Sequence, residues 1–159
     1  MGTQQILLIV LSVIIVGVAI AVGISMFNSQ AYNSNKTAIA SDAQSFATQV
    51  VQYYKTPQSQ GGFGGGTAKD ASDVLIPLED TIAALYAYLG WTDGETDNEN
   101  GLYAVTDVTS TTVEITGYGL SKKGTTWPSV VTTVTFPNGT VTAVAGDDGA
   151  ATGPSAVTP

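Results

Sequence analysis

The first thirty residues carry a long apolar run. Residues 6–27 are apolar except for two serines and two glycines, and the first charged side chain is Lys36. A run of this length is sufficient for a helix to cross a hydrocarbon core about 30 Å thick. A helix that is apolar on every face needs lipid or copies of itself around it, because a helix on the surface of a soluble domain keeps one polar face.

A second pattern continues the same helix. No Pro or Gly occurs between Ser25 and Thr56, and apolar residues recur there at steps of three and four. These residues are Ile39, Ala43, Phe46, Ala47, Val50, Val51 and Tyr54. The pattern predicts one helix over residues 1–55, about 80 Å long at 1.5 Å per residue. Its apolar half is 1–28, and its amphipathic half is 29–55.

The chain after this helix predicts a small globular head over residues 56–145. Pro57 ends the long helix, and a glycine-rich surface connector follows at 58–67. A short helix is expected at about 77–89. Its buried stripe would contain Leu78, Ile82, Leu85 and Leu89.

From residue 101 onward the hydrophobic period becomes two, which is typical of strands. Four strands are expected at about 102–107, 112–118, 129–136 and 140–145. The dipeptide Asn138-Gly139 favours a tight antiparallel hairpin between the last two. Residues 146–159 show no periodicity and are expected to form a surface tail. The predicted fold is α+β, with the long N-terminal α-helix packed against a small four-stranded antiparallel sheet.

Composition excludes several functional classes. The 159 residues include five Lys, no Arg and thirteen Asp plus Glu, for a net charge of -8, so the chain has no basic footprint for nucleic acid. It has no His and no Cys, which excludes imidazole chemistry, thiolate nucleophiles and the usual zinc ligands. The remaining carboxylates, lysines and hydroxyls form no acid-base or nucleophile constellation. We therefore expect no enzyme activity, no cofactor and no nucleic-acid partner.

An acidic segment at residues 93–100 alternates carboxylates, a pattern that can gather oxygen ligands around calcium. It is not an EF-hand loop, because Gly is missing from the sixth position and Ala104 stands at the twelfth. A solvated acidic turn and a calcium site both stay open as interpretations, and no metal ligand is assigned.

Residues 1–54 resemble the type IV pilins, a superfamily that includes bacterial pseudopilins and archaeal pilins. Residues 4–11, Gln-Gln-Ile-Leu-Leu-Ile-Val-Leu, look like the start of a mature pilin, and Phe27 leads into the amphipathic half. The resemblance implies a helix half embedded in a filament core, with a sheet wrapped on its other half. It also implies a homopolymer that is inserted in the inner membrane before assembly, built by a pilus assembly machinery and displayed as an extracellular filament on the cell surface.

The expected assembly residues lie in the apolar half. They are Gln5, Leu8, Leu11, Gly17, Gly23 and Phe27. Bacterial pilins commonly have a glutamate where Gln5 stands, so Gln5 offers hydrogen bonds without that charge. The two glycines have two interpretations, close helix approach and local stretching of the helix. Pilins usually have a short basic leader ending in Gly and a methylated Phe after it, and many close a C-terminal disulfide loop. This chain starts Met1-Gly2 and has no Cys.

Three alternatives stay open. The protein is a pseudopilin of a secretion system if the acidic segment binds calcium, or a single-pass anchored extracellular domain that binds a ligand. A cleaved signal peptide would use Ser29-Gln30-Ala31, but residues 1–5 hold no basic side chain and the apolar run is about twice the usual length.

Two glycosylation sequons occur. Asn35-Lys36-Thr37 is the candidate site, because the position of Asn138 is already explained by its turn.

Overall fold

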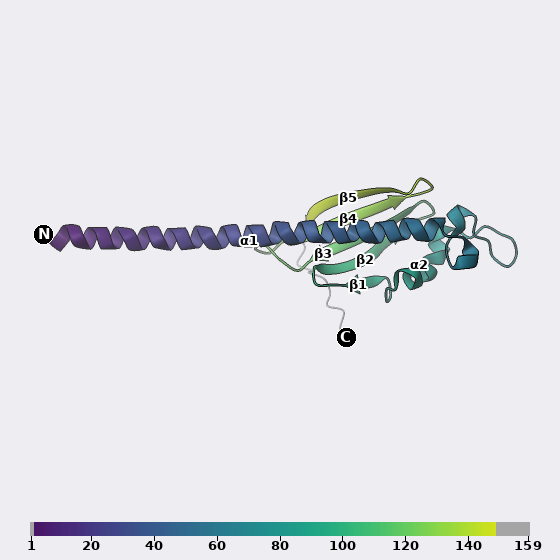
Figure 1. The fold of residues 1–159 in the computed structure, drawn as a ribbon, viewed down its shortest axis with the longest axis horizontal. Coiled ribbons are helices and arrows are strands. Elements are labelled where there is room, and N and C mark those ends of the chain that lie inside the picture. Colours follow the sequence, from purple (N-terminus) through teal and green to yellow (C-terminus); the bar gives the residue numbers. More distant parts are fainter. Residues whose placement is uncertain (1, 149–159) are drawn as a thin grey trace.

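A computed structural model describes residues 2–148. One helix, α1 (Gly2–Lys55), runs along the molecule, and the sheet and α2 lie beside its second half only (Figure 1). Residues 2–28 are exposed throughout, whereas the buried residues of α1 begin at Tyr32. The predicted single helix is confirmed. It is continuous because no Pro occurs before residue 57, and its two interior glycines, Gly17 and Gly23, each cost only about 1 kcal/mol.

The segment between α1 and the sheet is built from short helices. Two single turns of 3₁₀ helix, η1 (Gln58–Gln60) and η2 (Gly64–Gly66), form the glycine-rich connector. A third, η3 (Leu78–Thr81), leads into α2 (Ile82–Leu89). The helix expected at 77–89 is therefore 3₁₀ in its first turn and α-helical in the rest. Within its predicted stripe, Leu78 and Leu85 are buried, and the other two residues are half-buried.

The sheet has five strands, so the expected number of four is wrong. They are β1 (Glu95–Asp97), β2 (Gly101–Val108), β3 (Thr112–Gly119), β4 (Trp127–Thr135) and β5 (Thr140–Asp148). Each strand pairs antiparallel with the one before it, in the order β1-β2-β3-β4-β5. The additional strand is β1, which lies inside the acidic segment. This strand is too short and too charged to show a hydrophobic period.

The start of the predicted tail also belongs to the sheet. β5 extends to Asp148, because the register of β4 continues to the pair Trp127↔Asp148. Residues 146–148 are thus strand, and the rest of the predicted tail, 149–159, lies outside the described residues.

The β4–β5 hairpin confirms the predicted antiparallel pairing, and its loop is longer than two residues. The last paired residues are Thr135 and Thr140, which leaves a four-residue loop at 136–139 that includes a cis peptide before Pro137. Within this fully described loop, only Gly139 has a positive φ, at 73°. A two-residue Asn-Gly turn of type I′ needs positive φ at both residues, so the loop is of another kind.

The core lies between α1 and the inner face of the sheet. Ile39, Ala43, Ala47 and Val50 supply the helix side. Val113, Ile115, Val130 and Val134 supply the sheet side. The predicted stripe on α1 is therefore confirmed, and burial of each large aliphatic side chain stabilises the head by about 1.5–3 kcal/mol.

Aromatic side chains extend this core at two places. The ring of Phe46 lies edge-on to Trp91 and to Tyr103, with centroids 5.0 Å apart in each pair. At the far end of α1, the Tyr54 ring stacks on Phe136 at 4.0 Å. These rings pack in the core.

Candidate functional site: the projecting helix

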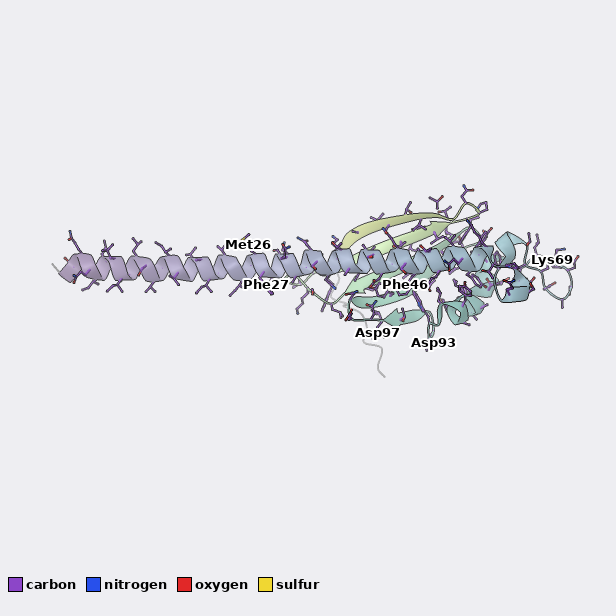
Figure 2. The ribbon with its side chains drawn as sticks, viewed as in Figure 1. Met26, Phe27, Phe46, Lys69, Asp93 and Asp97 are labelled. Carbon is purple, nitrogen blue, oxygen red and sulfur yellow. The ribbon has the colours of Figure 1, made fainter. Side chains whose placement is uncertain are left out.

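The first half of α1 projects from the head with its apolar side chains uncovered. Every large apolar side chain in residues 6–27 is at least half exposed, from 51% for Leu11 to 73% for Phe27. Figure 2 shows Met26 and Phe27 on the part of α1 that lies beyond the sheet. An apolar surface of this extent is typical of a protein or membrane interaction site.

This half is long and apolar enough to cross a membrane. Among the described residues, α1 is the only helix that meets this condition by length and composition, and its most apolar stretch has no buried residue. A core helix of a soluble protein can be equally apolar, but it is covered by its own chain. The exposure of residues 2–28 separates α1 from that class.

The six expected assembly residues all lie on this projecting half, and none of them is buried by the described chain. A Cβ added to Gly17 or Gly23 would meet nothing within 4 Å apart from the two chain neighbours and the adjacent helix backbone. The protein's own fold therefore gives no packing reason for glycine at either position. Any such reason comes from a surface outside this chain.

A polar group inside the apolar run is satisfied locally. The Ser12 hydroxyl donates to the Ile9 carbonyl oxygen at 2.8 Å. Such a bond to the preceding turn lets serine lie in lipid or in a dry helix bundle without an unpaired donor.

At the base of the head, a carboxylate on α1 clamps the turn between β1 and β2. Oδ2 of Asp42 accepts hydrogen bonds from Asn98 Nδ2 at 2.9 Å, Asn100 Nδ2 at 2.8 Å and the Tyr103 hydroxyl at 2.8 Å. The Asn98 side chain closes the turn itself, because its Oδ1 accepts from the backbone N–H groups of Asn100 and Gly101. We call Asp42, Asn98, Asn100 and Tyr103 the Asp42 clamp.

The Asp42 clamp changes the titration of its members. Burial alone would raise the pKa of the Asp42 carboxyl, but the three donated hydrogen bonds outweigh burial and lower that pKa. The pKa of Tyr103 is raised, first by burial and then by its bond to the ionised Asp42. The clamp is therefore in its bonded, charged form at neutral pH.

Asn35, the candidate glycosylation residue, takes part in a neighbouring contact. Its Nδ2 donates to the Asn100 carbonyl oxygen at 2.7 Å, and its Oδ1 accepts from the Ser121 N–H at 3.1 Å. Gly119 leaves the room for this side chain, since a Cβ there would collide with Asn35 Oδ1. The amide nitrogen that would carry a sugar thus holds α1 to the head. Asn138 of the second sequon is exposed.

The acidic segment gives no support to a calcium site. Within residues 2–148, no group of three or more acidic side chains converges closely enough to hold a metal ion. Asp93, Glu95 and Asp97 instead line an open surface pocket together with Thr92 and Thr96. The two asparagines of the segment belong to the Asp42 clamp.

The clamp could not be found from sequence periodicity, because its bonds join residues 56 to 61 positions apart. One signal was present in the sequence. Asp42 is the only acidic residue in α1, and it stands directly before Ala43 of the buried stripe.

No family model, curated protein or solved structure matches the chain.

Proposed function

We propose that this protein is the structural subunit of an extracellular, type IV pilus-like helical filament, which polymerises through residues 2–28 of α1. The observation that carries the proposal is the division of one continuous helix. Its second half completes the core of a folded head, while its first half leaves every large apolar side chain uncovered. A subunit of this shape requires a partner for one half of one helix.

Copies of the same helix are the partner that the proposal assigns. In a bundle of such helices, the apolar surface leaves water or lipid, and burial from water contributes about 25 cal/mol per Å². Gly17 and Gly23 allow close approach between neighbouring helices. Before assembly, the same segment is held in the inner membrane, from which a pilus assembly machinery extracts it.

The head is suited to the outer surface of such a filament. All charged side chains of the chain lie from Lys36 onward, so the part of the chain that follows the apolar run carries the whole net charge of -8. Net charge of this size favours solubility. The proposed function is structural, since residues 2–148 bring no nucleophile, base or metal ligand together in a recognisable catalytic arrangement.

A second candidate is a single-pass anchored domain that binds a ligand outside the cell. The membrane-compatible length of α1 favours it equally. It differs from a filament subunit in that the apolar helix would stay in lipid as a monomer. The pseudopilin alternative has no calcium site in the described residues to support it.

The test is to image surface material sheared from cells that carry wild-type protein or Leu8→Asp. We expect the variant to lose filaments, because an unpaired carboxylate in a dry apolar core costs several kcal/mol, and every subunit repeats that cost. Gln60→Asp introduces the same charge on an exposed residue of the head and should leave the filament yield unchanged.

The membrane-bound subunit is measured in parallel, so that a loss of insertion is not mistaken for a loss of assembly. Normal filaments from Leu8→Asp would contradict the proposal, and so would the absence of filaments from wild-type cells that carry abundant subunit.

A further inference from the structure

The two edges of the sheet differ in length and in charge. One edge is β1, which has three residues, two of them acidic. The other edge is β5, which pairs with β4 over nine positions without a shift in register. No described element pairs with the far side of β5, which forms the upper border of the head in Figure 1. One edge is therefore short and charged, whereas the other is long and regular.

β5 lacks the features that keep an edge strand from pairing. An edge strand presents a row of unpaired N–H and C=O groups, and soluble proteins protect it with charged side chains, proline, bulges or short length. Residues 140–146 contain no charged residue and no proline, and Val144 is 68% exposed. We call residues 140–146 the β5 edge. An unprotected edge of this kind favours the addition of another strand.

The hydrogen bonds of β4 show which backbone groups of the β5 edge point away from the sheet. The Phe136 N–H donates to the Thr111 carbonyl oxygen at 2.8 Å, on the β3 side. Backbone direction alternates along a strand, so Thr135 bonds toward β5, where its partner is Thr140. Every second residue of β5 from Thr140 onward bonds to β4 in the same way. Residues 141, 143 and 145 therefore direct their N–H and C=O groups outward.

From this arrangement we propose that the β5 edge pairs with the β5 edge of a second copy, as antiparallel strands, and that this contact joins two filaments side by side. The inference rests on the proposed function, because it requires filaments. It adds a contact between heads that the apolar half of α1 does not make.

The β5 edge is complementary to itself in the antiparallel direction. Its central residue is Ala143, so the register that pairs the whole edge with its copy places Ala143 opposite itself and Val141 opposite Ala145. Each outward residue then faces an outward residue, as a hydrogen-bonded antiparallel pair requires. The acidic residues 147 and 148 face residues 139 and 138 of the second copy, so the two acidic ends lie apart.

The joined sheet leaves room for both long helices. A two-fold axis that relates antiparallel strands is perpendicular to the sheet, so both copies of α1 lie on the same face. α1 packs more over β3 and β4 than over β5. The two β4 strands would be three strand spacings apart, about 14 Å. Packed helices need only about 10 Å between their axes.

The same symmetry decides which copies meet. β5 runs along the second half of α1, so a two-fold axis that reverses β5 also reverses α1 (Figure 1). The two projecting halves then point in opposite directions. Neighbours within one filament are related by rotation about its axis and translation along it, so they all point the same way, as do subunits inserted in one membrane. The β5 edge therefore joins subunits of two filaments that lie antiparallel.

A single contact of this kind is weak, and repetition makes it effective. Seven paired residues bury less than the roughly 1,600 Å² of a standard interface, so isolated heads are expected to stay monomeric. Two filaments present many heads to each other, and each contact that forms raises the effective concentration for the next. The net charge of -8 per chain opposes the approach of two filaments, and salt screens that repulsion. Side-by-side association should therefore increase with ionic strength.

The experiment uses sheared filaments of full-length chains with one introduced cysteine, which is the only thiol because the chain has no Cys. In a hydrogen-bonded antiparallel pair the two Cα atoms are about 5.5 Å apart, within the range that a disulfide spans. Oxidation of Ala143→Cys filaments should therefore give a disulfide-linked dimer on a non-reducing gel. Thr140→Cys is the matched control on the same exposed strand, because its own copy would be about 20 Å away and should not be linked.

Electron microscopy of the same material measures side-by-side association directly. We expect wild-type filaments to associate at high salt and Ala143→Pro filaments to stay single, because proline removes an outward N–H that the pairing with β4 does not use. Val144→Lys should also keep filaments single, because a lysine protects an edge strand. It decides the question if Ala143→Pro yields no filament. Thr125→Lys adds the same charge at an exposed position outside β5 and should leave the association unchanged.

Four results would overturn the inference and leave the proposed function standing. They are single wild-type filaments at every salt concentration, equal linkage of Ala143→Cys and Thr140→Cys, association of Val144→Lys filaments that equals the wild type, and association that appears only after residues 149–159 are deleted. The first would leave β5 to solvent or to a strand of another protein. The last would indicate that the end of the same chain covers β5.

Failure of the proposed function is a different result. The absence of filaments from wild-type cells that carry abundant subunit would contradict the proposed function and the inference together, whereas the four results above contradict the inference alone.

Discussion

Thr132 is fully buried on the inner face of β4, between residues that are apolar. Its neighbours in the register are Ile115 on β3 and Ala143 on β5. Its hydroxyl has no hydrogen-bond partner among the described residues. A buried hydroxyl without a partner costs about 1–3 kcal/mol, because it gives up its bonds to water and gains none. The position therefore lowers the stability of the head.

Thr132→Val should raise the free energy of unfolding by about 1 kcal/mol, since valine has the same branched shape without the hydroxyl. Thermal unfolding followed by circular dichroism measures the change. Thr133→Val, on the other face of the same strand, is the control and should change stability by less than about 0.5 kcal/mol. A loss of stability in Thr132→Val would mean that the hydroxyl has a partner that these contacts do not show.

The Asp42 clamp should make stability depend on pH. The pKa of Asp42 is lowered from its unfolded value of 3.8 in the folded protein, so its contribution is present above that value and is lost as the pH falls through the folded pKa. Asp42→Asn should destabilise the head at pH 7 by about 1 kcal/mol. The expected loss is small because solvent screens the interactions of a partly exposed carboxylate.

Unfolding measured from pH 7 down to pH 2 checks this prediction. The difference between wild type and Asp42→Asn should shrink below about pH 4. Tyr103→Phe removes one hydrogen bond to Asp42 and no charge. Its free energy of unfolding should also be lower than that of wild type, by a difference that depends on pH. If the difference in free energy of unfolding between wild type and Asp42→Asn stays constant from pH 7 to pH 2, ionisation of Asp42 contributes nothing to stability.

At the scale of elements, the strength of the hydrophobic period decided what could be predicted. α1 and the four longer strands have enough residues for a period of 3.6 or 2 to appear, and the structure contains all five. β1 has three residues, two of them acidic, and is fixed by pairing with Leu102, Tyr103 and Ala104. The last residues of β5 are strand because the register of β4 continues, although their own sequence is polar and glycine-containing.

The candidate site was predictable to a similar degree. The apolar run predicted a helix that needs lipid or copies of itself around it, and the structure leaves residues 6–27 exposed. The Asp42 clamp and the bonds of Asn35 join α1 to turns more than fifty residues away, and no local pattern encodes such contacts. The sequon at Asn35 marks a residue whose amide is already used in the fold.

Gln5 tests what surrounds the start of α1. Gln5→Leu should reduce the yield of sheared filaments while the amount of membrane-bound subunit stays constant. In a dry filament core the amide bonds to a neighbouring subunit, and each partner left unsatisfied costs about 1–3 kcal/mol. At the level of lipid headgroups, water satisfies the same amide, and the substitution should have little effect. Equal filament yield would remove Gln5 from the assembly residues.

At the scale of the whole molecule, the chain consists of a projecting helix and a head that share α1. The head uses residues from Tyr32 onward for its core, and it needs none of residues 2–28. The proposed function therefore assigns assembly to residues 2–28 and solubility to the head, and truncation separates the two parts.

Deletion of residues 1–28 should give a soluble, monomeric head, because the stripe on the remaining part of α1 is already covered by the sheet. Sedimentation and circular dichroism measure its mass and its folding. A truncated chain that aggregates, or that still forms filaments, would show that the head carries an assembly surface of its own.

The unbroken course of α1 also has a mechanical consequence. The projecting half of α1 continues without a loop into the half that packs in the head. If residues 2–28 are held by a partner, tension between them and the head passes along the backbone hydrogen bonds of α1. The head cannot swivel on a flexible joint. A pulling force is resisted first by the backbone hydrogen bonds of the helix, and each of Gly17 and Gly23 costs that helix about 1 kcal/mol relative to alanine. Under load, we expect the protein to lengthen by local uncoiling there before the head unfolds.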